Sequence, residues 1–187
     1  MPPIVKITKN DIIQTSLNLI RANGIDGSNA RGIAAALGCS TQPIFSNFSS
    51  MEELEETVIS AAYELYFDFL RRETESGKYP QYKSFGMAYI RFADEEKQLF
   101  KLLFMRDRRG EDLTPTADFE NSVQIIMDSC GVSHEIASLM HMEMWACVHG
   151  IATMLVTSFL TLEWELISNM LTDVYQGIRT RHISEGN

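Results

Sequence analysis

The sequence predicts an all-α fold of about nine helices. Apolar residues recur at spacings of three and four over most of the 187 positions, which is the period of an amphipathic helix. No segment shows the regular alternation of apolar and polar residues that marks a half-buried strand. Glycines, prolines and hydroxyl residues interrupt the helical pattern where helices would begin and end. We therefore expect helices packed on helices.

The first helix is predicted from Thr8 to Asn23. Thr8 can cap the first free amide groups, and Gly24 suits the turn that ends the helix. The inward-facing residues are spaced by three and four along it. This helix is expected to support the two short helices that follow.

Two short helices joined by a sharp turn are predicted over residues 28–48. Ser28 is the expected N-cap of the first, and Gly38 takes a turn that a side chain with a Cβ would resist. Ser40 is the expected N-cap of the second, which covers residues 41–47. The residues expected to face inward are Ile33, Ala34, Leu37, Ile44 and Phe48. The layout is that of a helix-turn-helix, whose second helix lies in the major groove of DNA.

The outer face of the second short helix is polar and uncharged. It carries Thr41, Gln42, Ser46 and Asn47, which suit base edges and phosphate oxygens. Pro43 is tolerated because it falls in the first turn, where its missing N–H had no partner. The alternative for so short a helix is an ordinary polar surface.

Charge is distributed unevenly along the chain. The net charge is −9, which by itself argues against a nucleic-acid partner. Residues 1–50, however, hold four basic and two acidic residues, whereas the rest of the chain holds 12 basic and 23 acidic ones. The N-terminal part is therefore the one segment with a positive balance, and a local balance is what DNA phosphates meet.

A long connecting helix is predicted at residues 51–77. Ser50 and Glu53 form a capping box at its start, and glutamates crowd its first turns, where the helix dipole favours anions. These carboxylates would repel a phosphate backbone, so the helix is expected to point away from DNA. It would connect a helix-turn-helix domain at residues 1–50 to the remainder of a larger domain at 51–187.

The rest of the chain predicts further helices, separated by short breaks. Asp94 and Ser133 are expected N-caps, and Thr161 precedes the last helix. A charged loop with Arg106, Arg108 and Arg109 is expected at residues 105–115. The expected helices cover residues 82–93, 94–104, 116–130, 133–159 and 162–179.

Residues 10–58 resemble the N-terminal part of the TetR family of bacterial transcriptional regulators. The matching residues are Ser28, Arg31, Ile33, Ala34, Gly38, Ser40, Phe45, Phe48 and Leu54. The C-terminal part is similar as well. Residues 94–104 resemble a family helix with a Leu-Leu-Phe ending, and residues 145–150, WACVHG, resemble the Trp-x-x-His-Gly signature of one subgroup.

The resemblance implies a ligand-responsive regulator, most often a repressor, that binds a palindromic operator in double-stranded DNA as a homodimer. It implies DNA contacts from Ser28, Arg31, Ser40, Thr41, Gln42, Pro43, Phe45, Ser46 and Asn47. Phe45 and Met51 stand where the family usually has a tyrosine and a lysine that contact phosphates. We therefore expect operator binding to depend less on salt, with the log–log slope reduced by roughly 0.9 for each lost contact.

By the same resemblance, helices 133–159 and 162–179 would pair with their copies in a four-helix bundle. Their apolar content exceeds what one thin helical layer can cover. The residues concerned are Met140, Met144, Val148, Ile151, Leu155, Leu162, Leu166 and Met170. The alternative is that all of them face the protein's own core.

The resemblance also implies a small-molecule effector in the larger domain. Ligand sites are apolar with few polar anchors, and the aromatic and methionine residues available would suit an apolar or planar molecule. The candidate pocket residues are Phe100, Phe104, Met127, Met144, Trp145 and His149. The alternative is that the methionines and aromatic residues form an adaptable core and that His149 is a structural hydrogen-bonding residue. Bound ligand would shift residues 94–106 against the connecting helix, and so change the spacing of the two recognition helices of a dimer.

Other classes of function find little support in the sequence. No apolar signal core opens the chain, and the least charged stretch, residues 144–162, contains His149 and follows an amphipathic pattern, so a cytoplasmic protein without a membrane span is expected. Cys39, Cys130 and Cys147 stand singly, which favours free thiols. The histidines lack metal-ligand spacing, and no cofactor or catalytic motif occurs. We expect no enzyme; the alternatives are a helical protein-interaction or small-molecule-binding protein without operator binding, and then a helical enzyme.

Overall fold

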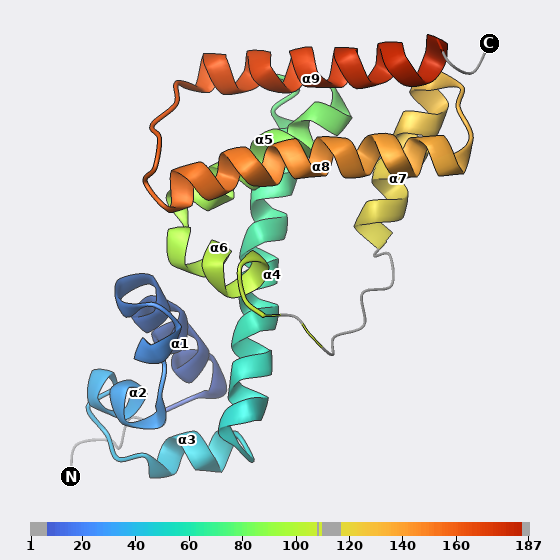
Figure 1. Ribbon diagram of the computed structural model, residues 1–187. Helices are drawn as coiled ribbons and strands as arrows, with labels where there is room; N and C mark the ends of the chain where they lie inside the picture. The colour runs from blue at the N-terminus through green and yellow to red at the C-terminus, as the bar shows by residue number, and fades with distance from the viewer. Residues whose placement is uncertain (1–6, 108, 110–116, 185–187) are drawn as a thin grey trace. The chain divides into compact units, whose positions relative to one another are not determined.

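The computed structural model describes residues 7–107, 109 and 117–184, and every regular element in them is helical (Figure 1). The all-α prediction is confirmed. The chain forms two compact units. Unit 1 comprises residues 1–67 and 96–106, and unit 2 comprises residues 68–95 and 107–187. The predicted functional boundary at residue 50 stays a prediction.

Unit 1 is built around helix α1, which contacts α2, α3 and α6 (Figure 1). The bounds are Lys9–Asn23 for α1, Ala30–Ala36 for α2, Gln42–Asn47 for α3, Met51–Glu75 for α4, of which unit 1 holds the part up to residue 67, and Lys97–Phe104 for α6. A short 3₁₀ helix, Ile25–Gly27, precedes α2. The core of unit 1 includes Ile12, Leu17, Ile33, Ile44, Phe48, Leu54, Leu99, Phe100 and Leu103, all fully or almost fully buried.

Two predicted helix starts in unit 1 are displaced by one residue. Asn29, rather than Ser28, caps α2, and its side chain accepts a hydrogen bond from the backbone N–H of Gly32 at 3.0 Å. Ser28 instead ends the 3₁₀ helix, donating its N–H to Ile25. Thr41 occupies the N-cap position of α3 in place of Ser40, and its side chain makes no capping hydrogen bond.

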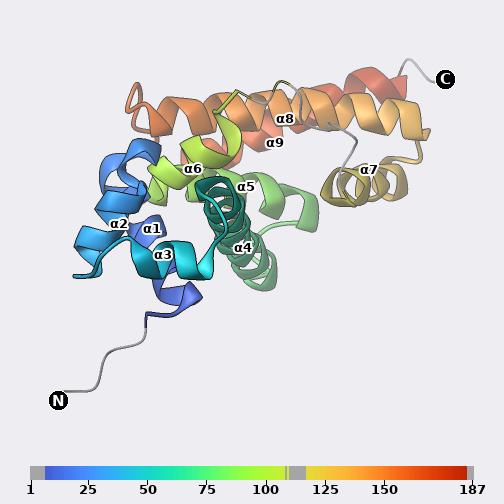
Figure 2. The ribbon, with the colours of Figure 1, turned by 90° about the horizontal axis from the view of Figure 1, so that it is seen from below.

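Unit 2 is organised around helix α8, which packs against α5, α7 and α9 (Figure 2). The bounds are Gln81–Glu95 for α5, Ala117–Cys130 for α7, His134–Val156 for α8 and Trp164–Ser184 for α9. Ser133 caps α8 as predicted. Asp94 does not cap a helix; it lies inside α5, and α6 begins after Glu96 without a side-chain cap. The predicted loop at residues 105–115 lies largely outside the described residues, Arg108 included.

Helix α8 is apolar on more than one side because three helices cover it. Met140, Met144, Val148, Ile151 and Leu155 are all buried within unit 2. The prediction that these five residues form a dimer face is therefore wrong, and the alternative that they face the protein's own core holds for them. Within the described part of the chain, α8 is the one helix long and apolar enough to cross a membrane, a test that buried core helices also pass.

Candidate DNA-binding surface and regulatory domain

The turn between α2 and α3 is closed by backbone hydrogen bonds. Gly38 adopts a positive φ of 66°, which a residue with a Cβ resists. Its N–H donates to the carbonyl of Ala35 at 3.2 Å, and the N–H of Cys39 donates to that of Ala34 at 3.0 Å. Buried Ile33 and Ala34 on one side of the turn, and Ile44 on the other, anchor both helices in the core. The helix-turn-helix geometry predicted for this segment is thus present.

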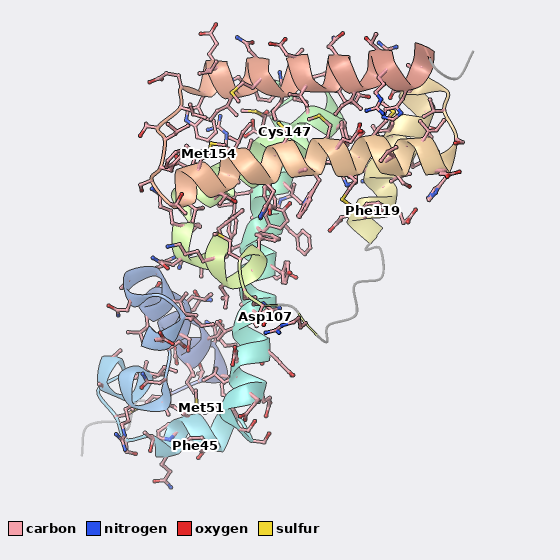
Figure 3. All side chains as sticks on the ribbon, viewed as in Figure 1. Phe45, Met51, Asp107, Phe119, Cys147 and Met154 are labelled. Carbon is pink, nitrogen blue, oxygen red and sulfur yellow. The ribbon has the colours of Figure 1, made fainter. Side chains whose placement is uncertain are left out.

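The outer face of α3 presents Gln42, Phe45 and Ser46 to solvent, and Figure 3 shows Phe45 on this helix. Phe45 is 51% exposed, which is high for so large an apolar side chain. The hydroxyl of Ser46 donates to the carbonyl of Gln42 at 2.9 Å, and the amide of Asn47 donates to that of Pro43 at 2.7 Å. Two of the side chains expected to contact DNA therefore donate hydrogen bonds to their own helix.

The remaining candidate DNA-contacting residues flank α3. Ser40 and Arg31 are exposed, whereas Ser28 and Thr41 are half-buried. Arg31 lies on α2, Ser40 and Thr41 lie between α2 and α3, and Ser28 precedes α2 at the end of the 3₁₀ helix. Their predicted contacts with DNA stay predictions.

Two of the four cations counted in the N-terminal segment, Lys9 and Arg21, are engaged within unit 1. Arg21 forms a two-point ion pair with Glu96, with both N–O distances at 2.8 Å. Lys9 lies 3.3 Å from a carboxylate oxygen of Glu53 and over the ring of Phe48. Arg31 is exposed and has no carboxylate partner among the described residues.

Glu53 at the start of α4 is bonded through both its backbone and its carboxylate. Its backbone N–H donates to the hydroxyl oxygen of Ser50 at 3.2 Å, which is one half of the predicted capping box. The carboxylate accepts hydrogen bonds from the backbone N–H and the hydroxyl of Ser49, both at 2.7 Å, rather than from Ser50. These bonds, together with Lys9, lower the pKa of Glu53 from 4.5 to about 2. The carboxylate of Glu53 therefore stays ionised through the physiological range and holds the start of α4 to Ser49 in the connection after α3.

Met51, which replaces the family's usual lysine, lies at the start of α4 (Figure 3). It is half-buried and lines a cavity of about 370 Å³ within unit 1. The other lining residues are Ile20, Ile25, Asp26, Ser28, Asn29, Leu54, Glu55, Val58, Ile59 and Leu102. Of the predicted DNA-contacting residues only Ser28 lines this cavity, and none of the predicted pocket residues does.

The predicted pocket residues divide between the two units. Phe100 is fully buried in unit 1, and Phe104 packs edge-on against Tyr66 of α4 with ring centroids 5.3 Å apart. This contact places α6 against the connecting helix, as expected from the sequence. Met144 is buried in unit 2, and Met127 packs against the cluster that includes the α7 and α8 residues Val123, Ile126, Ala137 and Met140.

Trp145 and His149 form a stacked pair on α8. Their ring centroids are 5.0 Å apart and the planes differ by 13°. The Nδ1 atom of His149 lies 2.9 Å from the hydroxyl of buried Tyr89, and burial lowers the pKa of His149. Three residues separate Trp145 from His149, one more than in the subgroup signature, so the subgroup assignment stays a prediction. The extra residue places the two rings one helical turn apart, which allows them to stack.

A second polar pair in unit 2 was not predicted from the sequence. The hydroxyl of Tyr82 on α5 lies 2.8 Å from Nδ1 of His141 on α8, and the ring of Phe119 packs edge-on against the same histidine. Burial lowers the pKa of His141 and raises that of Tyr82. The partners are about 60 residues apart in sequence, so no local pattern could indicate the pair.

The remaining candidate sites hold no assembled chemistry in the described ranges. Cys39, Cys130 and Cys147 are unpaired. No group of three metal-ligating side chains gathers among the residues the structure describes. The features that remain are the exposed polar side chains of α3 and the aromatic pair Trp145 and His149 on α8.

Comparison with known proteins finds a family model that matches the second half of the chain. No curated protein matches the chain. Residues 82–172 match the family model described as "Tetracyclin repressor-like, C-terminal domain". This match covers α5 to α8 and the first part of α9, and it excludes the helix-turn-helix. The N-terminal resemblance rests on separate residues and points to the same family. Residues 82–172 therefore form a tetracycline repressor-like C-terminal domain, and this match supports a place for the chain in the TetR family.

Proposed function

We propose that the protein is a cytoplasmic, ligand-responsive repressor that binds a palindromic operator as a homodimer. The tetracycline repressor-like domain supports a regulatory role. The observation that carries DNA binding is the helix-turn-helix itself: a glycine turn at Gly38 with an exposed polar helix after it. Such a helix enters the major groove with side chains from its N-terminal half against the bases.

Arg31 provides the sharpest test of phosphate contact. It is exposed on α2 and is the cation in the predicted DNA surface, whereas Arg71 is equally cationic but lies in unit 2 on α4. Removing one phosphate contact lowers the slope of log affinity against log salt by about 0.9. We expect Arg31→Ala to lower the slope by this amount and Arg71→Ala to leave it unchanged.

The measurement is a gel shift with DNA flanking the protein's own gene, repeated over a series of salt concentrations. A discrete complex that resists nonspecific competitor supports the proposal. Absence of any specific complex with genomic fragments would instead favour a helical interaction protein that does not bind operators. Equal slopes for the two arginine variants would show that Arg31 does not contact phosphate.

A face of unit 2 remains suited to self-association. Leu139 and Met142 lie three residues apart on α8 and are about half-exposed. Phe159 is 74% exposed in the connection after α8, and Leu166 on α9 is also exposed. Large exposed apolar side chains are typical of interaction surfaces, and a second copy presenting its own α8 and α9 would cover them.

A charge placed on this face tests the homodimer. Met142→Lys introduces an ammonium group at an exposed position, so the monomer fold should persist while dimerisation weakens by at least tenfold, since a buried unpaired charge is costly. Gln124→Lys, at an exposed position on α7, is the matched control. Sedimentation over a concentration series measures both. A dimer unaffected by Met142→Lys would move the interface elsewhere.

The effector is proposed to be a small apolar or aromatic molecule bound in the tetracycline repressor-like domain. Trp145 stacked on His149 offers an aromatic surface there, with the indole 46% exposed. The chain joins α5 of unit 2 directly to α6 of unit 1 between Glu95 and Glu96. A displacement of α5 on ligand binding would pass through this junction to α6, which contacts α1. An effector that binds tightly without changing operator affinity would refute this coupling.

A further inference from the structure

The hydrogen bonds along α3 separate side chains that are free to contact bases from those that are not. Ser46 donates its hydroxyl proton to a carbonyl one turn back, and Asn47 donates its amide in the same way. Gln42 and Phe45 make no such bond, and both are exposed. They lie three residues apart on the same face of the helix, with Cβ atoms about 5–6 Å from each other.

The chemistry of these two side chains is selective. The amide of Gln42 presents a donor and an acceptor in one plane, which matches N6 and N7 of adenine in the major groove; guanine presents two acceptors there. The helix carries no lysine or arginine, the usual partners of guanine. Phe45 has no hydrogen-bonding group, and the apolar group on base edges in the major groove is the thymine methyl.

We infer that α3 recognises adjacent A·T base pairs, with Gln42 bonded to an adenine and the Phe45 ring packed against a thymine methyl. Neighbouring base pairs are about 3.4 Å apart, so side chains with this separation can reach consecutive steps. This inference rests on the proposed operator binding. It also gives a role to Phe45, which stands where the family usually has a tyrosine. Without the hydroxyl the side chain loses a phosphate contact, and the inferred contact with a thymine methyl takes its place.

The experiment selects bound sequences from a randomised duplex pool with the full-length protein. The expected half-site contains at least two consecutive A·T pairs. In the selected duplex, 7-deazaadenine then replaces adenine at each A·T position in turn to remove N7, and deoxyuridine replaces thymine to remove the methyl group. We expect one adenine whose replacement weakens binding by about fivefold and a neighbouring thymine whose replacement weakens it by about fourfold, as expected for one hydrogen bond and one methyl contact.

The variants assign each effect to a side chain. Gln42→Ala should abolish the sensitivity to 7-deazaadenine and keep the sensitivity to deoxyuridine, and Phe45→Ala should do the reverse. Ser46→Ala is the matched control on the same helix and should keep both sensitivities. Circular dichroism confirms that each exposed-site variant is folded.

The outcomes are distinguishable. A selected half-site of G·C pairs, or wild-type binding indifferent to both base analogues, would overturn the inference and leave operator binding standing. Sensitivities that persist in the corresponding alanine variants would overturn it as well. Failure to select any sequence with the folded protein would overturn the proposed function along with the inference.

Discussion

The ion pair between Arg21 and Glu96 should contribute measurably to the stability of unit 1. Arg21 is in the last turn of α1, and Glu96 directly precedes α6. The guanidinium meets both carboxylate oxygens at 2.8 Å, and the side chains are 34% and 19% exposed. Partial burial and two-point geometry distinguish this pair from an ordinary surface ion pair.

The expected magnitude follows from that geometry. Exposed ion pairs contribute about 0.2–1 kcal/mol, and hydrogen bonds to charged groups about 1.5–3 kcal/mol. Allowing for partial solvent screening, we expect a coupling energy between Arg21 and Glu96 of about 1–2 kcal/mol. Arg71 and Asp68 on α4 are the matched control: they form one contact, at 2.8 Å, and are 64% and 49% exposed. Their coupling should be about 0.3 kcal/mol.

Double-mutant cycles measure both couplings by urea unfolding. The variants are Arg21→Gln and Glu96→Gln, singly and together. The control variants are Arg71→Gln and Asp68→Asn, also singly and together. Far-ultraviolet circular dichroism follows all helices. Trp145 and Trp164, the two tryptophans of the chain, both lie in unit 2, so their fluorescence provides a separate probe of that unit. A coupling no larger than that of Arg71 and Asp68 would refute the argument that burial and two-point geometry strengthen the pair.

Two further predictions concern unit 2. Burial lowers the pKa of His141 below 6.5 in the folded state, so the unfolded chain binds more protons. The free energy of unfolding should therefore fall between about pH 7 and pH 5, and His141→Gln should reduce this pH dependence in denaturation curves. Gly150→Ala should raise the free energy of unfolding by about 0.5–1 kcal/mol, because a Cβ there meets nothing within 4 Å. Gly86→Ala should raise the free energy of unfolding by less than Gly150→Ala, or lower it, since its Cβ would lie 3.2 Å from Val148 and 3.3 Å from Leu171. Equal increases in the free energy of unfolding for both variants would show that these two side chains move aside at little cost.

Local signals in the sequence predicted where helices begin and end better than they predicted which residues meet across the fold. Thr8 caps α1 as predicted, because the cap and the amide that it accepts from lie within three residues; Asp11 completes a capping box that was not predicted. Asp94 failed as an N-cap because α5 continues through it; an acidic residue between two apolar runs does not show which helix it belongs to. Arg21 and Glu96 lie 75 residues apart, so only the folded chain brings them together.

The error in the predicted dimer face has a physical cause. Periodicity shows which positions are apolar but not what covers them. Helix α8 contacts three other helices of its own unit, so Met140 and its neighbours at helical spacing are buried without a second copy. Leu139 and Met142 are equally apolar in the sequence and exposed in the structure. The distinction depends on tertiary packing, which the helical period alone does not contain.

The engagement of cations within unit 1 bears on how an operator would be selected. Nonspecific DNA binding depends almost wholly on contacts between cations and phosphates. Lys9 and Arg21 are paired with carboxylates, and α3 has no cation, so Arg31 is the charge left on the predicted surface in the described part of the chain. The affinity of the protein for nonspecific DNA should therefore be low. A low nonspecific affinity raises the ratio of specific to nonspecific binding, so bulk DNA competes weakly with an operator. If Gln42 and Phe45 contact bases as inferred, a surface whose described residues hold one unpaired cation would bind DNA in general weakly, and most of its affinity would depend on the bases that these two side chains meet.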